Sequence, residues 1–114
     1  MRIILENYKM PSWNTLYSGR HWSTRKEMAD YAHQSVKIAL IGKDTTPYLS
    51  PVDISITAYL KRTIDPDNVC SKLVIDGIKM TGLIQDDTPK YVNSVTVRVV
   101  KSKEEKTVID ISCP

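Results

Sequence analysis

The clearest periodic pattern in the chain is the alternation of apolar and polar residues over residues 52–60, VDISITAYL. Every second position from Val52 to Ala58 is apolar and polar residues fill the positions between, which predicts a half-buried strand. The opening residues 2–8, RIILENY, also read as a short strand. Near the end, YVNSVTVRVVK and KTVIDIS are rich in β-branched residues and are separated by the charged turn SKEE. These two segments are therefore predicted to form a closing hairpin.

Helical spacing appears twice between these strands. Residues 25–40 carry apolar residues on one face, and Ser23 or Thr24 can cap this helix, with Glu27 completing a capping box after Thr24. A second helix is predicted from Asn68 to about Met80, with Asp67 at its N-cap and a glycine where it should stop. The order strand, helix, strand, helix, strand, strand predicts a single α/β (α+β) domain over 1–114. We expect a mixed sheet of about four strands with two helices, without repeats or linkers.

Composition narrows the classes of protein that fit. The chain has 114 residues, 41% hydrophobic and 25% charged, which is ordinary for one globular domain and disfavours disorder. No apolar run approaches the roughly 18 to 20 residues of a membrane helix, and the start turns polar too early for a secretory signal. Cys70 and Cys113 form neither a disulfide framework nor a zinc spacing. A reducing cytoplasmic setting is the simplest expectation.

Charge is unevenly distributed along the chain. Residues 65–87 hold five aspartates against two lysines, a local charge of −3, whereas the rest of the chain carries +6. An acidic pocket on a basic body suits a metal-dependent enzyme that acts on a polyanion. A scatter of solvated charges is the alternative. Between residues 9 and 23, aromatic residues alternate with basic ones, which suits either nucleic-acid stacking or hydrophobic anchoring of a long loop.

The acidic stretch IDPDNVCSK raises the question of a helix cap or a metal site. Asp65 and Asp67 are two residues apart on an extended segment and can point the same way, whereas Asn68, Lys72 and Asp76 share one stripe of the predicted helix. The helix dipole eases carboxylate repulsion by only about 0.3 to 1 kcal/mol, so a hard cation such as Mg²⁺ would do far more.

A second acidic pair, Asp86 and Asp87, could complete such a site. Asp87 lies near the helix cap only if the chain folds back along the helix after Gly82. On the alternative interpretation, Asp67 is an ordinary cap, Asp86 and Asp87 are turn residues, and Asp76 pairs with Lys72. The stretch lacks the glycine and the glutamate of an EF-hand loop. The chain has no P-loop, GxSxG or HExxH motif, so no nucleotide cofactor is expected.

The stretch DPDNVCSKLVIDGIKMTGLIQDD resembles the signature of the RusA family of phage and bacterial Holliday junction resolvases. The signature runs D-x-D-N, then Lys, Asp and Gly, then a terminal D-D. Eight positions match it in order: Asp65, Asp67, Asn68, Lys72, Asp76, Gly82, Asp86 and Asp87. Lys72 follows Asp67 one residue later than in many members of the family. The other segments are loosely similar to phage members over the whole chain.

The resemblance implies a homodimeric, Mg²⁺-dependent endonuclease (Mn²⁺ being a possible substitute) that resolves four-way DNA junctions by paired symmetric nicks in recombination and repair. It implies Asp65, Asp67 and Asp87 as metal ligands and catalytic residues, with Asp86 as a helper and Lys72 at the scissile phosphate. The setting would be the cytoplasm of a bacterium or a phage-infected cell. Candidate phosphate contacts, each of which could instead be a solvated charge, are Arg20, Arg25, Lys26, Lys61, Arg62 and Lys90.

Two rival functions remain open from the sequence. The first is a structure-selective DNA-binding protein of the same fold that cleaves weakly or not at all. The second is a small interaction module whose acidic cap binds no metal. Binding to DNA in EDTA, with no nicking when metal is present, distinguishes the first, and the absence of any stabilisation by Mg²⁺ distinguishes the second.

Overall fold

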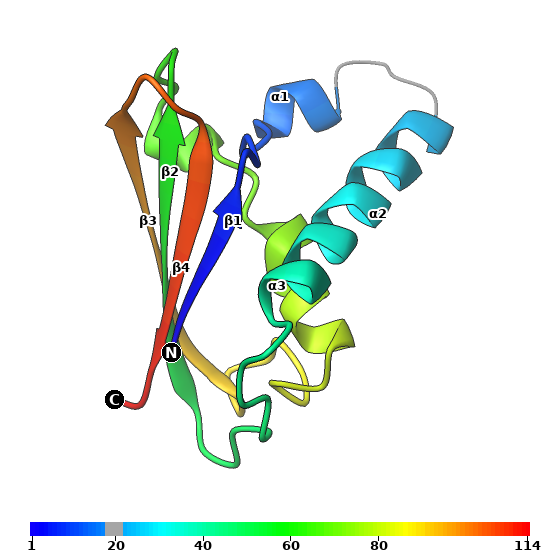
Figure 1. Cartoon of the computed structure of the whole chain (residues 1–114), viewed down its shortest axis with the longest axis vertical. Coiled ribbons are helices and arrows are strands. Elements are labelled where there is room, and N and C mark those ends of the chain that lie inside the picture. Colours follow the sequence, from blue (N-terminus) through cyan, green and yellow to red (C-terminus); the bar gives the residue numbers. More distant parts are fainter. Residues whose placement is uncertain (18–21) are drawn as a thin grey trace.

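The strands form one four-stranded mixed sheet in the order β1-β4-β2-β3 (Figure 1). The computed structural model describes residues 1–17 and 22–114. The predicted strand over 52–60 is confirmed at both ends. Its alternating apolar residues bury one face completely. The bounds of the strands are β1 Arg2–Glu6, β2 Val52–Leu60, β3 Val92–Lys101 and β4 Lys106–Ser112.

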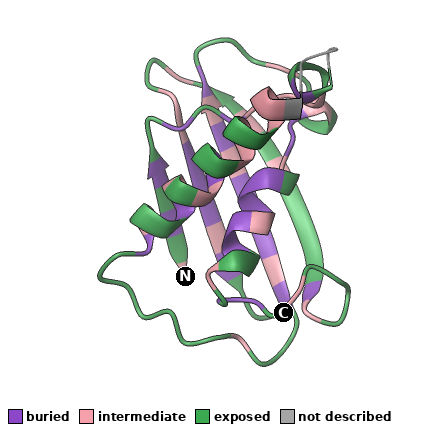
Figure 2. Ribbon diagram, turned by 90° about the vertical axis from the view of Figure 1, so that its right-hand side faces the viewer, coloured by how far each residue is buried: buried purple, intermediate pink, exposed green. Residues whose placement is uncertain are grey.

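The two long helices pack on one face of this sheet, and the other face is open (Figures 1 and 2). The expected α+β fold with a mixed four-stranded sheet is confirmed. Two shorter helices, α1 and the 3₁₀ helix η1, add to the two that the sequence predicts. The helices are α1 Trp13–Leu16, α2 Trp22–Ala39, η1 Pro66–Asn68 and α3 Lys72–Met80. Among the described residues, no helix is long and apolar enough to cross a membrane.

The predicted closing hairpin is wrong. Although β3 and β4 follow each other in the chain, β2 lies between them, parallel to β3 and antiparallel to β4. The connection 102–105 therefore crosses the end of β2, where Ser102 N–H donates to the Leu60 carbonyl at 2.9 Å and Lys61 N–H to Glu105 Oε2 at 3.3 Å. A short charged turn between two β-branched segments favours a hairpin locally, but the pairing of β2 with β3 along one edge and with β4 along the other overrides it.

The predicted start of the second helix is also wrong, and Asp67 does not cap it. Pro66–Asn68 form one turn of 3₁₀ helix, the chain leaves helical geometry at Val69, and α3 begins only at Lys72 after Ser71. The cause is tertiary: Val69 forms a bridge with Ser12, and Cys70 N–H donates to the Pro11 carbonyl at 2.8 Å. Asn68 therefore does not share a helical stripe with the residues of α3.

The core lies between the sheet and the helices. Its largest fully buried side chains come from every strand except β3 and from both long helices, and they include Leu5, Ile56, Ile109, Val36 and Ile78. The two helices approach closely at Gly77, where a Cβ atom would meet Val36 Cγ2 at 3.1 Å. This packing fixes α3 against α2, and so sets where the chain enters and leaves α3.

Candidate metal and nucleic-acid site

The acidic segment that precedes α3 is held in place by short-range and long-range hydrogen bonds. Asn68 N–H donates to the Asp65 carbonyl at 2.9 Å, closing the 3₁₀ turn. Asn14 N–H in turn donates to Asn68 Oδ1 at 3.4 Å, across 54 positions of sequence. Together with the Cys70 bond to Pro11, this contact places the opening loop and α1 beside the acidic segment. In the sequence these two segments were considered separately, and the fold places them next to each other.

The carboxylates of Asp65 and Asp67 are exposed at this point. Asp65 occupies the N-cap position of η1 but makes no side-chain cap bond, and Asp67 lies in its first turn. Over the described part of the chain, no hydrogen bond or ion pair occupies either carboxylate. Two acidic side chains on a well-anchored backbone, without internal partners, are available to an external cation.

The second acidic pair has a different environment. Asp86 Oδ1 accepts from the Asp87 backbone N–H at 2.8 Å and lies 3.3 Å from Lys79 Nζ. The hydrogen bond from the Asp87 N–H, followed by the contact with Lys79, lowers the pKa of Asp86, and the Asp86 carboxylate in turn raises the pKa of Lys79. Asp86 is therefore firmly ionised at neutral pH and already partly neutralised, which fits a turn residue at the end of α3.

The two acidic pairs lie at opposite ends of the sheet within one chain. Asp65 and Asp67 come after the end of β2, whereas Asp86 and Asp87 precede β3, whose first residue pairs with the first residue of β2. Figure 1 shows the green segment after β2 at the upper end of the sheet and the yellow segment after α3 at the lower end. At about 3.3 Å per residue, β2 alone separates the two ends by about 26 Å.

The fold-back after Gly82 that would bring Asp87 near the start of α3 does not occur. Gly82 does end α3, with φ +83°, but the chain then runs on to β3 at the far end of the sheet. Among the described residues, no three or more His, Cys, Asp or Glu side chains are grouped to hold a metal ion. The two acidic pairs are therefore separate within one chain and do not form the single cluster that the resemblance implies.

Lys72 is the first residue of α3 and forms an ion pair with Asp76, with Lys72 Nζ 3.3 Å from Asp76 Oδ2. This pair matches the alternative interpretation of Asp76 as a helical i, i+4 partner. The Lys72 side chain is 55% exposed, so the pair is a weak surface contact. A phosphate group could displace the carboxylate without disturbing the core.

The opening loop provides aromatic and basic side chains next to the acidic segment. The rings of Trp13 and Tyr17 stack with centroids 5.9 Å apart, and the Arg25 guanidinium lies 5.8 Å from the Tyr17 ring. Trp13 packs against the core while Tyr17 is 60% exposed. Hydrophobic anchoring of the loop is therefore confirmed at Trp13, whereas nucleic-acid stacking stays a prediction for the exposed Tyr17 ring. Arg20 lies outside the described residues.

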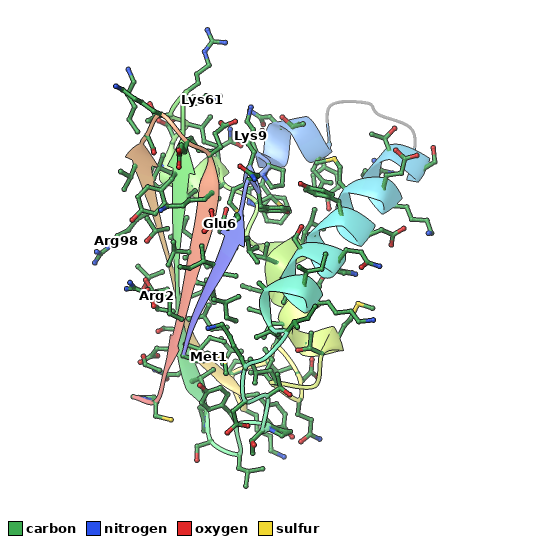
Figure 3. All side chains as sticks on the ribbon, in the orientation of Figure 1. Met1, Arg2, Glu6, Lys9, Lys61 and Arg98 are labelled. Atoms are coloured by element: carbon green, nitrogen blue, oxygen red, sulfur yellow. The ribbon has the colours of Figure 1, made fainter. Side chains whose placement is uncertain are left out.

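A basic pocket lies at the same end of the sheet. Its volume is about 400 Å³ and its lining is Lys61, Lys101, Ser102 and Lys103. Figure 3 shows Lys61 and Lys9 at this upper end of the sheet. Lys101 and Lys103 were missed from the sequence. The register that pairs Leu60 with Lys101 carries the signal, because it brings the 101–103 turn beside Lys61.

The other predicted basic residues are less clearly placed for a ligand. Arg62 is exposed beside Lys61. Lys26 Nζ is held by Asp30 Oδ2 at 2.9 Å on the surface of α2. Lys90 lies at the opposite end, beside the second acidic pair, with its Nζ 5.6 Å from the Tyr91 ring. The basic residues therefore accompany both acidic pairs, most densely Asp65 and Asp67.

A larger pocket of about 670 Å³ lies between α2 and α3, and none of the predicted site residues lines it over the described chain. Its lining includes His33, Ile41 and Met80. Comparison with known proteins adds no assignment, because no family model and no curated protein matches the chain.

Proposed function

We propose that this chain is a divalent-metal-dependent endonuclease that resolves four-way DNA junctions by paired symmetric nicks, as the RusA family does, in the cytoplasm of a bacterial or phage-infected cell. The observation that carries the proposal is the exposed, unpaired carboxylate pair Asp65 and Asp67, anchored beside an aromatic and basic surface. Exposed carboxylates suit a cation, and adjacent stacking and basic side chains suit DNA. A carboxylate that only caps a helix would need neither stacking nor basic side chains beside it.

The donor set fits Mg²⁺ or Mn²⁺ in chemistry. Mg²⁺ typically binds one or two protein carboxylates and takes its remaining ligands from water and substrate phosphate, so Asp65 and Asp67 meet the minimum. Bound there, the ion would supply an activated water near neutral pH and would neutralise charge on the phosphate. Lys72, freed from Asp76, would contact the scissile phosphate and offset negative charge that develops in the transition state.

DNA backbone would lie along the end of the sheet. Tyr17 offers an exposed ring for stacking on an unpaired base, with Arg25 beside it. Lys61, Lys101 and Lys103 surround a pocket wide enough for a phosphate group. Phosphate contacts of this kind position the duplex without reading its sequence, which is what a junction-selective enzyme needs.

A homodimer would supply the missing half of each site. Within one chain, Asp86 and Asp87 lie at the opposite end of the sheet from Asp65 and Asp67. The two pairs can therefore meet only when they come from two copies of the chain. A two-fold dimer would then hold two equivalent composite sites. Two sites related by a two-fold axis also match paired nicks on opposed strands of a junction.

The alternative function is structure-selective DNA binding without efficient cleavage. The separation of the two acidic pairs within one chain favours it, since Asp65 and Asp67 alone are a minimal metal site. On this alternative the aromatic and basic surface would bind junctions with or without divalent ions. Mobility-shift assays in EDTA and nicking assays in Mg²⁺ separate the two functions directly.

The decisive experiment is cleavage of a synthetic four-way junction with Mg²⁺ or Mn²⁺. Wild-type protein should nick opposed strands symmetrically, and Asp67→Asn should bind the junction but lose nicking by about a hundredfold or more, as expected when a metal ligand is removed. Asp30→Asn, a surface carboxylate paired with Lys26 on α2, is the matched control and should cleave normally. Full activity in Asp67→Asn, or no nicking by wild type with any divalent ion, would contradict the proposal.

A further inference from the structure

The pocket between α2 and α3 lies apart from both acidic pairs. The two helices pack against each other on one face of the sheet (Figures 1 and 2), and the pocket between them has a volume of about 670 Å³. Over the described chain, its lining contains none of the residues assigned to the proposed nuclease site. Pockets of about 300 to 1,000 Å³ are typical of sites for small organic molecules. The pocket therefore has the size of a ligand site, and its role is independent of the proposed function.

One part of the pocket lining is apolar and exposed. Ile41, just after the end of α2, is 77% exposed, and Met80, the last residue of α3, is 69% exposed. Both line the pocket together with Leu40, which is buried. Exposed apolar side chains around a concave surface are typical of ligand-binding grooves. They favour an apolar or aromatic body in the molecule that binds.

The charged residues of the pocket leave one positive charge without a partner. Asp30 Oδ2 accepts from Lys26 Nζ at 2.9 Å, so this carboxylate is already paired with a cation. Lys37 lies about two turns further along the same face of α2, and its side chain has no ion-pair or hydrogen-bond partner among the described residues. A negatively charged group in the pocket would gain from Lys37, whereas a cation would be repelled by it.

His33 adds a hydrogen-bonding atom that lacks a partner. It lies one turn before Lys37 on α2, and its ring lines the pocket. Its Nε2 is buried, and the described residues provide no hydrogen-bond partner for it. Burying a polar atom without a partner costs free energy, so native structures rarely leave one in this state. A hydrogen-bond acceptor bound in the pocket can supply that partner once the ring turns toward it.

We propose that the pocket between α2 and α3 binds a small apolar or aromatic carboxylate. Its apolar body would pack on Ile41 and Met80, and its carboxylate would contact Lys37 and Nε2 of His33. A helix from a partner protein fits less well, because helix-binding grooves present apolar contacts over several turns. Here the exposed apolar side chains lie only at the C-terminal ends of α2 and α3.

Phenylbutyrate and phenylbutyramide are matched probes, because they share an apolar body and differ in the charge of the head group. Added to isotope-labelled protein, phenylbutyrate should shift the NMR signals of backbone amides around the pocket, centred on Lys37, Gly77 and Thr81. It should also shift the ring nitrogen signals of His33. Phenylbutyramide should bind at the same place about fivefold more weakly, since it lacks the charge that Lys37 pairs with.

Substitutions of exposed side chains test the two halves of the pocket without disturbing the core. Lys37→Gln should weaken phenylbutyrate binding by about fivefold and leave phenylbutyramide binding unchanged. Lys43→Gln, an exposed lysine outside the lining, is the matched control and should change neither. Ile41→Ser should weaken both probes by about threefold, because apolar contact is lost for each. Leu49→Ser is its control, since Leu49 is 94% exposed and lies outside the lining.

The possible outcomes decide the proposal without reference to DNA cleavage. Phenylbutyrate binding that depends on Lys37 and Ile41 but not on their controls supports the site. No binding at millimolar concentration, amide shifts away from the pocket, or equal affinities of wild type and Lys37→Gln overturns it. Self-association of the wild type that Ile41→Ser abolishes, with neither probe bound, also overturns it and assigns the pocket to a second copy of the chain. Since no measurement involves a junction, loss of the nuclease proposal would leave this site standing, and the reverse holds too.

Discussion

At the scale of single residues, the aspartates differ in whether their carboxylates have a hydrogen-bond or ion-pair partner. Asp53, Asp76, Asp86 and Asp110 each accept from a neighbouring donor or cation, and their positions are explained by the fold. Asp65 and Asp67 have no such partner among the described residues, although their backbone is firmly held. An ordered backbone with unpaired carboxylates is the combination that a binding site needs, because ordering has already been completed before a ligand arrives.

Asp53 provides a prediction about pH. Its Oδ1 accepts from the Ser94 hydroxyl at 2.6 Å and from Asn93 Nδ2 at 2.8 Å, and these bonds, the hydroxyl first, lower the pKa of Asp53. Because the folded-state pKa is depressed, the stabilisation is present above about pH 4 and is lost as pH falls through the folded pKa. Asp53→Ala should therefore be less stable than wild type near neutral pH, with the difference shrinking in acid.

Urea unfolding midpoints at several pH values measure this effect. Asp30→Ala is the control, because its carboxylate contacts Lys26 on the surface of α2 and does not link two strands. A stability difference between wild type and Asp53→Ala that stays constant down to low pH would show that the charge of Asp53 does not matter for the hydrogen bonds that link β2 to β3.

At the scale of elements, the contact between α2 and α3 depends on the absence of a side chain at position 77. A Cβ atom there would lie 3.1 Å from Val36 Cγ2 and 3.4 Å from His33 Cα. The buried positions of α3 surround this glycine on the face that meets α2. The small residue lets the helices approach, and the direction of α3 in turn fixes the positions of both acidic pairs.

Gly77→Leu should consequently destabilise the protein by about 1 to 3 kcal/mol through overpacking, despite the better helix propensity of leucine. Met80→Leu on the same helix is the control, since Met80 is 69% exposed and should change stability by less than about 0.5 kcal/mol. Thermal and urea unfolding give both values. Equal stability of Gly77→Leu and wild type would mean that the two helices can separate without cost.

Local patterns predicted the elements better than their connections. The alternation over 52–60 identified β2 to the residue because every second side chain of that strand is buried in the core. The helix start at Asn68 was wrong because Val69 and Cys70 bond to Pro11 and Ser12, residues too distant in sequence for any local signal. The hairpin failed for the same reason, since only the completed sheet shows that β2 lies between β3 and β4.

For the candidate site, too, the sequence indicated the residues better than their arrangement in space. The residue types and order of the acidic stretch indicated metal chemistry, and Asp65 and Asp67 are indeed exposed together. Their distance from Asp86 and Asp87 depends on the path of α3 and on the parallel pairing of β2 with β3, which spacing cannot reveal. Lys101 and Lys103 were missed because only strand register places them beside Lys61.

At the scale of the whole molecule, the two separate acidic pairs predict complementation between inactive variants. If each site combines Asp67 of one copy with Asp87 of the other, Asp67→Asn and Asp87→Asn should each abolish nicking alone. Mixing the two proteins and allowing subunits to exchange creates heterodimers in which one site carries both lesions and the other carries none. Such heterodimers should regain metal-dependent nicking, restricted to one strand of the junction.

A site formed within single chains predicts the opposite result, because every chain in the mixture would then carry one lesion. Mixing Asp67→Asn with Asp65→Asn is the matched control: both lesions fall in the same acidic pair, so no heterodimer contains an intact site. Nicking of a strand-labelled junction distinguishes the cases, and sedimentation with one variant size-tagged confirms that subunits have exchanged. Exchange without recovered nicking would exclude a composite site and leave Asp65 and Asp67 as the whole of any metal centre.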